Sequence, residues 1–318
     1  MYRKTIWRIK NTPTYLKRGY RWLMECAIKL ASFPYYLSKK KDHILLTVSL
    51  PLFKTNQTNW GDDVSIVLVE HLSGKRVIPY NRVLPSKPNF ACIGSILTSR
   101  IDRKSIVWGS GVISSTHKMK HIPAKVLAVR GPLTRAYLLE RHIDCPEIFG
   151  DPALLFPYLY TPPAPQKKYR LGIICHHLEL TDSRLRNQLN TFPDCLLIDI
   201  VNYGKWTGFI DQLCSCDFVI SSSLHGLIIA DAYRVPNYWF CFSGKLVDNG
   251  FKFRDYFLSI NKPEITQPIF FNEEVPYEQI LSYQQEWRAA KIDLRPLVEA
   301  CPFLPAGSPL LAEKLMLE

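Results

Sequence analysis

The chain has 318 residues, with 40 Lys and Arg against 28 Asp and Glu and a hydrophobic fraction of 47%. Eleven of the basic residues and a single acid lie in residues 1–41, so this segment carries a net charge of +10 and the rest of the chain carries +2. A nearly neutral body argues against a nucleic-acid-binding face, and the composition excludes a disordered, collagen-like or coiled-coil chain. The length fits two domains.

The basic segment 1–41 is interleaved with aromatic residues. Its most apolar stretch, residues 22–37, is interrupted by Glu25 and Lys29 and is shorter than the roughly 20 residues of a transmembrane helix. Two hypotheses fit this pattern: a helix lying on an anionic membrane surface, or a solvated extension. We expect a cytoplasmic protein, and the first hypothesis places it peripherally on the cytoplasmic membrane face. Co-sedimentation with anionic vesicles, with and without residues 1–40, separates the two, because equal pelleting excludes membrane binding.

After residue 41, short apolar runs alternate with amphipathic stretches. In chain order, the pattern predicts a strand at 43–50, a helix at 62–71, strands at 105–108 and 125–129, and a helix at 132–141. The proline-rich residues 161–166 predict a linker. After it, we expect strands at 170–175, 196–200, 218–221 and 238–242, with helices at 181–190, 207–214 and 224–233.

This alternation predicts an α/β protein with parallel sheets. We expect two Rossmann-like domains, residues 42–160 and residues 161–318 with a C-terminal helical tail, which face each other across a cleft and follow the basic extension 1–41. Ligands of such sheets bind at the carboxyl ends of the strands. Functional residues should therefore lie where a strand turns into a helix.

The nine cysteines are odd in number and include no Cys-x-x-Cys pair. They predict buried thiols in a reducing compartment. Cys214 and Cys216 are expected together at one helix end. The chain also contains no Asp-x-Asp sequence, so we assign no metal site.

Three strand-to-helix corners carry polar residues that packing alone does not require. The corner at 59–63 contains Asn59 and Asp62, although a turn with a helix N-cap accounts for most such residues. Arg130 ends a strand directly before a helix, where its guanidinium can share an anion with the free backbone N–H groups of the first turn. His225 follows three serines in the first turn of the next helix. A helix N-terminus favours neutral imidazole, and a bound phosphate would favour imidazolium.

Taken in order along the chain, these corners resemble the polysaccharide pyruvyl transferase family. The matching segments are residues 59–62, 94–95, 108–111, 129–134, 150–155, 221–226, 230–232 and 235–236. Each short motif is weak alone, whereas the ordered set is specific. The resemblance leaves out the basic extension and the chain after about residue 262.

The resemblance implies a GT-B-like fold of two Rossmann-like domains and the transfer of pyruvate from phosphoenolpyruvate onto a sugar as a ketal. The acceptor would be an exopolysaccharide or another surface glycan, lipid-linked in the pathways of this family. Phosphoenolpyruvate is then a donor substrate, and no cofactor is implied. The partners are this donor, the glycan and, through residues 1–41, an anionic membrane, with no nucleic acid.

The resemblance also implies the roles of the donor-site residues. Arg130, Ser223, Leu224 and His225 bind phosphoenolpyruvate, and His225 is the general acid that protonates its methylene carbon. Some relatives carry an Arg where this chain has Ser223, which leaves more of the anion binding to Arg130 and the helix termini.

On the acceptor side, Asn59 and Asp62 bind the sugar, and Asp62 is the candidate base. Asp151 is interpreted as a structural cap. Two alternatives stay open: a glycosyltransferase that uses a nucleotide sugar in the same cleft, and a non-catalytic, membrane-associated assembly factor.

Overall fold

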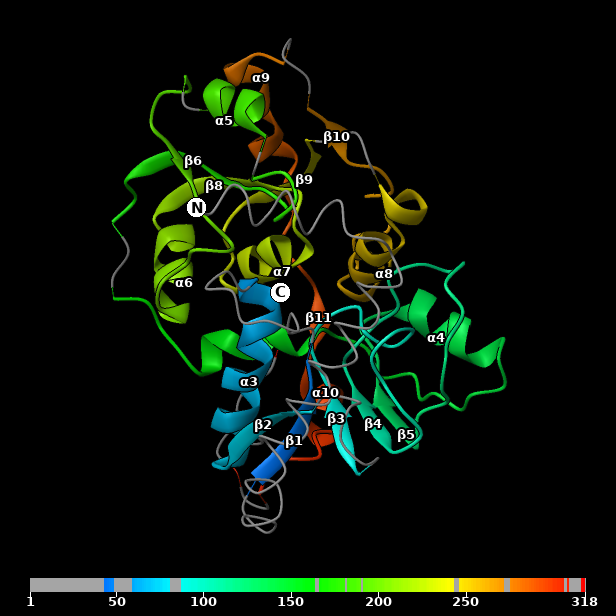
Figure 1. Cartoon of the computed structure of the whole chain (residues 1–318). Coiled ribbons are helices and arrows are strands. Elements are labelled where there is room, and N and C mark those ends of the chain that lie inside the picture. The colour runs from blue at the N-terminus through cyan, green and yellow to red at the C-terminus, as the bar shows by residue number, and fades with distance from the viewer. Residues whose placement is uncertain are drawn as a thin grey trace, which may run out of the picture.

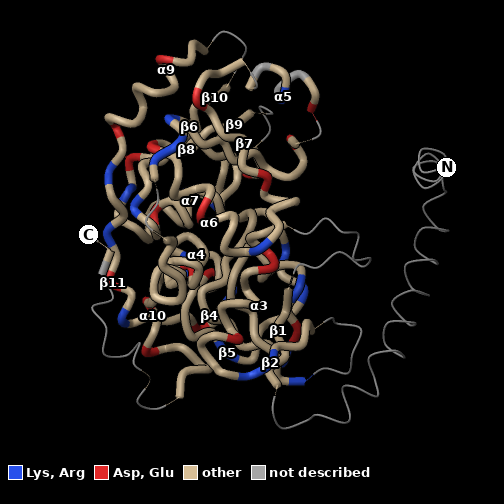
Figure 2. Tube along the Cα trace, turned by 90° about the vertical axis from the view of Figure 1, so that its left-hand side faces the viewer, with Lys and Arg blue, Asp and Glu red and all other residues tan. Residues whose placement is uncertain are grey.

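The structure is a computed structural model. It describes residues 43–48, 59–80, 87–163, 166–180, 182–189, 191–242, 246–271, 275–305, 308 and 316–317. The basic extension, and with it the membrane hypothesis, lies outside the described residues. Within the described ranges, no helix is long and apolar enough to cross a membrane. Basic and acidic residues are interspersed along the described trace (Figure 2).

The first half of the chain forms a five-stranded parallel sheet, at the bottom of Figure 1. Two α-helices accompany it, α3 (Trp60–Ser73) and α4 (Pro132–Leu139). The 3-10 helix η1 (Pro152–Tyr158) follows them. The strands, in chain order, are β1 (His43–Thr47), β2 (Arg76–Tyr80), β3 (Asn89–Ala91), β4 (Ser105–Trp108) and β5 (Lys125–Ala128).

The second half forms another five-stranded parallel sheet, at the top of Figure 1. Its strands are β6 (Tyr169–Ile174), β7 (Cys195–Leu197), β8 (Cys216–Ser221), β9 (Asn237–Cys241) and β10 (Ile269–Phe270). Its helices are α5 (Ser183–Leu189), α6 (Trp206–Cys214) and α7 (Leu224–Ala232). The remaining elements are η2 (Val247–Gly250), α8 (Phe251–Ser259), α9 (Tyr277–Ser282), η3 (Tyr283–Glu286), β11 (Ile292–Asp293), α10 (Arg295–Glu299) and β12 (Met316–Leu317).

Both sheets have the same strand order. Across the first it is β2-β1-β3-β4-β5, and across the second it is β7-β6-β8-β9-β10. This doubly wound order reverses between the first and third strands, and ligands of such sheets bind in the crevice outside the carboxyl ends at that reversal. The two expected ligand positions are therefore the ends of β1 and β3 and the ends of β6 and β8.

The predicted α/β class and the parallel, Rossmann-like sheets are confirmed, whereas the GT-B assignment and the domain limits 42–160 and 161–318 stay predictions. The last part of the chain returns to the first sheet. Trp108 Nε1 donates to the Leu297 carbonyl oxygen at 2.8 Å, and the ring of Phe303 packs edgewise on Phe90 and Trp108. Helix α8 lies beside α4 (Figure 1).

Helix α3 joins the two halves. The fully buried Trp60 stacks on Phe209 of α6, with ring centroids 4.5 Å apart. Its backbone N–H donates to Ile200 at 2.8 Å, and its indole N–H donates to the Trp206 carbonyl oxygen at 2.9 Å. One hydrophobic core consequently continues from the first sheet through η1 and α7 to the second.

The eight cysteines that the structure describes are free thiols, and most of them are buried, as predicted. Burial raises the pKa of the Cys145 and Cys301 thiols to about 11. The expectation for Cys214 and Cys216 was wrong, because Cys214 ends α6 and Cys216 begins β8. A single residue, Ser215, makes the turn between them.

Candidate active site

Asp62 lies in the first turn of α3. Asn59 is the N-cap, and its side-chain oxygen accepts from the Gly61 N–H at 3.0 Å. Trp60 anchors the turn in the core. The Asn59 carbonyl group is thus engaged in holding the helix end, as the N-cap interpretation predicts.

The N-termini of α3 and α7 meet at Gly61. A Cβ atom built on Gly61 would lie 1.9 Å from Nδ1 of His225. Only glycine fits at this distance, so the Gly in the Asn-Trp-Gly-Asp segment makes room for the imidazole. His225, from the second half of the chain, therefore contacts α3 of the first half at the residue that precedes Asp62.

His225 lies in the first turn of α7, whose N-cap is Ser223. The turn is held by Ser221, whose hydroxyl accepts from the Ser223 N–H at 3.0 Å and donates to the Ser223 carbonyl oxygen at 2.9 Å. Nε2 of His225 is buried and has no hydrogen-bond partner among the described residues. Burial lowers the pKa of His225 to about 3, with Lys252 and Arg130 acting in the same direction. The free protein therefore holds a neutral imidazole with an unused nitrogen.

Arg130 lies at the predicted corner before α4. The anion that it shares with the α4 N-terminus is the carboxylate of Asp255, a residue of the protein itself. Its guanidinium is fully buried and contacts the Asp255 carboxylate through Nε at 3.0 Å and Nη2 at 2.9 Å. The Thr134 N–H in the first turn of α4 donates to the other oxygen of Asp255 at 2.8 Å. Nη1 of Arg130 donates to Ser95 Oγ at 2.6 Å, and Nη2 also donates to the Val112 carbonyl oxygen at 2.7 Å.

The glycine-containing loops after β3 and β4 surround this guanidinium. A Cβ atom on Gly111 would lie 2.4 Å from Cζ of Arg130. Ser110 ties the two loops together by donating to the Gly94 carbonyl oxygen at 2.7 Å. These loops therefore enclose the guanidinium of Arg130, which donates its hydrogen bonds to groups of the protein.

Two ionisable groups beside His225 have strongly shifted pKa values. Burial raises the pKa of Asp62 to about 7, and the neighbouring charge of Asp63 adds to the rise, whereas Arg100 and Lys252 oppose it. Burial lowers the pKa of Lys252, in α8, to about 8, and Arg130 acts in the same direction. Among the described residues, Lys252 has no ion-pair partner. Both groups can exchange a proton near neutral pH, which is typical of active sites.

The carboxyl end of β6 adds a second group of polar residues. The His176 backbone N–H donates to Ser222 Oγ at 2.8 Å and to Glu179 Oε2 at 3.1 Å, and the Ser222 hydroxyl also donates to Glu179. The rings of His176 and His177 lie 4.2 Å apart. Burial lowers the pKa of His176 to about 3, so this imidazole is neutral as well.

Asp151 is the N-cap of η1, as predicted, and its Oδ1 accepts from the Ala153 N–H at 3.0 Å. Its Oδ2 is buried without a hydrogen-bond partner among the described residues, and burial raises its pKa to about 6. Asp151 therefore caps η1 within the field of Arg130 and Asp255.

A family model of the polysaccharide pyruvyl transferases matches residues 2–240. The chain belongs to this family. The residues at the junction of the two sheets therefore lie within the part of the chain that matches the polysaccharide pyruvyl transferase family.

Two curated proteins are similar to this chain. An uncharacterised protein of Acanthamoeba polyphaga mimivirus is 28% identical over 62% of the chain and 69% of its own length. The succinoglycan biosynthesis protein ExoV of Rhizobium meliloti is 25% identical over 64% of the chain, which spans 62% of that protein. A crystal structure of a functionally uncharacterised Klebsiella pneumoniae protein matches 78% of the chain at 15% identity, with a TM-score of 0.41.

Of the predicted site residues, the structure brings together Asp62, Ser223, Leu224 and His225 at the junction of α3 and α7. Arg130 is hydrogen-bonded to Asp255, and Asn59 caps α3. The roles assigned to all six stay predictions.

Three kinds of residue at this site were not predicted from the sequence. Lys252 lies between two phenylalanines on a helix and carries no sequence signal. Asp255 is 125 residues from its partner Arg130. His176 and His177 directly follow a predicted strand, so the rule that ligands bind at strand carboxyl ends could have found them.

Proposed function

We propose that this family member transfers the pyruvyl group of phosphoenolpyruvate onto a sugar of a surface glycan as a ketal, at the junction between α3 and α7. The observation that carries the proposal is the buried, unpartnered Nε2 of His225 at the N-terminus of α7, where His225 contacts α3 at the residue before Asp62 and lies within the field of Lys252. An unused nitrogen in a buried site indicates a ligand, because buried polar atoms otherwise have partners.

The donor needs hydrogen-bond donors and positive charge, since phosphoenolpyruvate carries a phosphate and a carboxylate. The first-turn N–H groups of Leu224 and His225 have no acceptor within the helix and favour an anion there. The Ser223 side chain makes no cap bond and is available as a further donor. Lys252 supplies a positive charge that no carboxylate of the described residues pairs with. The guanidinium of Arg130, by contrast, is bonded to Asp255.

The proposed reaction begins when the bound phosphate raises the pKa of His225, which then takes up a proton. His225 donates this proton to the methylene carbon of phosphoenolpyruvate, leaving an oxocarbenium-like centre at the neighbouring carbon. A first sugar hydroxyl attacks that carbon and gives its proton to the Asp62 carboxylate. A second hydroxyl displaces phosphate, which carries its proton away. The two sugar hydroxyls lose two protons in total. One compensates for the proton that His225 gave to the new methyl group, and the other leaves with phosphate.

This scheme predicts that phosphoenolpyruvate binds more weakly as the pH rises from 7 to 9. The phosphate group of phosphoenolpyruvate is doubly ionised above about pH 7. A change of affinity with pH above this value therefore comes from groups of the protein. His225, with a free pKa of about 3, takes up a proton on binding, and affinity should fall about tenfold per pH unit. Above about pH 8 the fall should steepen, because Lys252 loses its proton.

Calorimetry in buffers of different ionisation enthalpy measures this proton uptake. We expect His225→Gln to remove most of it and Lys252→Arg to remove only the steepening above about pH 8, since arginine stays protonated. Lys104→Arg, at an exposed lysine, is the control. An affinity that is independent of pH in the unmodified protein would exclude this role of His225.

The donor itself is tested by thermal unfolding of the full chain with phosphoenolpyruvate or with UDP-glucose. A ligand at about 100 times its Kd stabilises by about 2.7 kcal/mol, which raises the Tm by several degrees. We expect this rise with phosphoenolpyruvate and none with UDP-glucose. The reverse result would assign the cleft to a nucleotide-sugar glycosyltransferase.

A further inference from the structure

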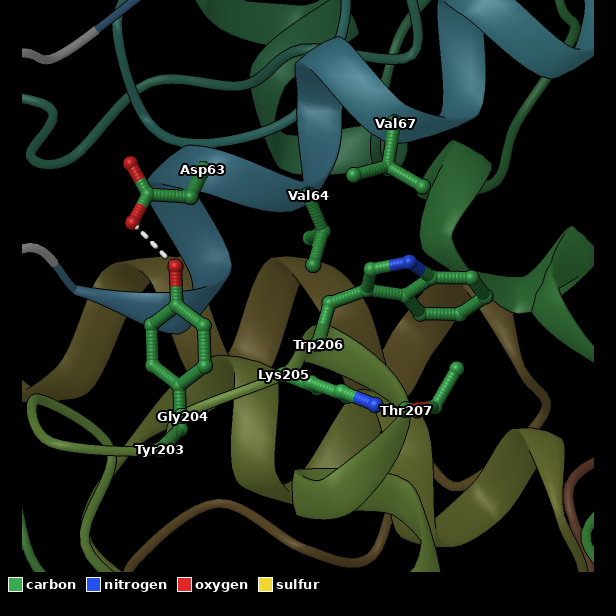
Figure 3. A pocket seen from close by; sticks show the side chains of 8 residues that line it. All are labelled: Asp63, Val64, Val67, Tyr203, Gly204, Lys205, Trp206 and Thr207. Carbon is green, nitrogen blue, oxygen red and sulfur yellow. Dashed lines mark hydrogen bonds between the residues drawn. The ribbon is translucent and has the colours of Figure 1, made fainter.

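A pocket lies along α3. It has a volume of about 510 Å³ and lies between α3 and the loop that leads from β7 into α6 (Figure 3). This volume is in the range of sites for small organic molecules. The α3 side contributes Asp63 and Val67, and the loop contributes Tyr203, Lys205 and Trp206.

The lining residues Trp206 and Tyr203 are held in place by contacts with neighbouring residues. The indole ring of Trp206 packs edgewise on Tyr160, with centroids 5.4 Å apart, and on Phe156 at 5.5 Å. The Trp206 carbonyl oxygen accepts from Trp60 of α3 at 2.9 Å, which fixes the loop against the helix. Tyr203 closes one end, where its hydroxyl donates to Asp63 Oδ2 at 2.5 Å (Figure 3).

The lining combines an aromatic face with charged and hydroxyl groups. Trp206 and Val67 offer apolar surface, while Asp63, Lys205 and Thr207 offer an acceptor, a cation and a hydroxyl. A pyranose ring has the complementary surface, with apolar C–H faces that pack on an aromatic ring and hydroxyls that bond to charged groups. A saccharide therefore fits this lining better than a purely apolar or a purely anionic molecule.

The position of the pocket relates it to the reaction. Asp62 and Asp63 are consecutive in the first turn of α3, and successive helix residues point about 100° apart. Asp62 lies near Gly94, at the end of β3, whereas Asp63 bonds to Tyr203 in the pocket. A glycan with one sugar at Asp62 would bring its neighbouring sugar to Asp63.

We infer that this pocket binds the saccharide unit next to the one that receives pyruvate. The inference rests on the proposed function for its place in the reaction. Saccharide binding itself can be measured without phosphoenolpyruvate.

The test applies the full chain to an array of mono- to hexasaccharides of glucose, galactose, mannose and N-acetylhexosamines. We expect at least one oligosaccharide to bind more tightly than its component monosaccharides. Asp63→Asn and Lys205→Ala should each weaken that binding about tenfold, as loss of a hydrogen bond to a charged group does. The control variants, Tyr238→Phe and Glu286→Gln, remove a similar exposed tyrosine–carboxylate bond at the edge of the second sheet.

Two outcomes would overturn the inference: no oligosaccharide bound more tightly than its monosaccharides, or binding that Asp63→Asn and Lys205→Ala leave unchanged. Thermal stabilisation by phosphoenolpyruvate distinguishes these failures from failure of the proposed function. If phosphoenolpyruvate stabilises the protein while no oligosaccharide binds, only the pocket along α3 is wrongly assigned. If an oligosaccharide binds through Asp63 and phosphoenolpyruvate has no effect, the saccharide pocket stands and the donor is wrong.

Discussion

Replacing His225 with glutamine is expected to lower the rate of pyruvyl transfer by roughly 10²–10⁴-fold, the usual contribution of one positioned general acid. Glutamine preserves much of the side-chain volume against Gly61 and the hydrogen-bonding capacity, but it cannot donate a proton as imidazolium does. The measurement is the transfer of label from radiolabelled phosphoenolpyruvate to the glycan fraction of the host's membranes. His117→Gln, at an exposed histidine, should transfer label at the unmodified rate.

Gly61→Ala tests the same site without removing the imidazole. The added Cβ would lie 1.9 Å from Nδ1 of His225, so the ring must move. A fall in transfer rate with unchanged thermal stability would show that the position of the ring matters. Full activity in both His225→Gln and Gly61→Ala would remove His225 from the mechanism.

Replacing Arg130 with methionine is expected to lower the free energy of unfolding by about 3–5 kcal/mol, because it leaves the buried Asp255 carboxylate without its cation. Both side chains are fully buried, and Thr134 would be the remaining donor to the carboxylate. Urea unfolding followed by circular dichroism measures the change. Arg130→Met combined with Asp255→Leu should recover part of the loss, since no charge then stays unpaired.

Arg295→Met is the matched control, because it removes an arginine from an exposed ion pair with Asp293 and should leave stability nearly unchanged. The experiment also separates two roles of Arg130. If Arg130→Met is as stable as the unmodified protein but no longer binds phosphoenolpyruvate, Arg130 is a donor ligand, as the family resemblance implies, and not a structural partner of Asp255.

Much of the fold could be predicted from the sequence because the strands that carry it are continuous apolar runs. The strands β1, β4, β5, β6, β8 and β9 all lie where such runs indicate. Strands β2 and β3 were missed because β2 contains Pro79 and exposed residues and β3 has only three residues. Their pairing with β1, at the edge and in the middle of the sheet, comes from tertiary context and not from local pattern.

The candidate site was predictable where it lies at strand-to-helix corners, as with Asp62 and His225. It was not predictable where it depends on partners distant in sequence. Arg130 and the α4 N-terminus were expected to bind the anion of a ligand, and nothing in the sequence indicates that the carboxylate of Asp255 lies between them. In the same way, the pKa of Lys252 depends on burial against residues from both halves of the chain.

The most direct test of the proposed function is mass spectrometry of the surface glycan from the host carrying the unmodified chain, lacking it, or carrying His225→Gln. We expect ketal-linked pyruvate with the unmodified chain, none without it, and little or none with His225→Gln at equal protein abundance. A glycan with full pyruvate content in the His225→Gln host would contradict catalysis in this cleft and would favour a non-catalytic assembly factor.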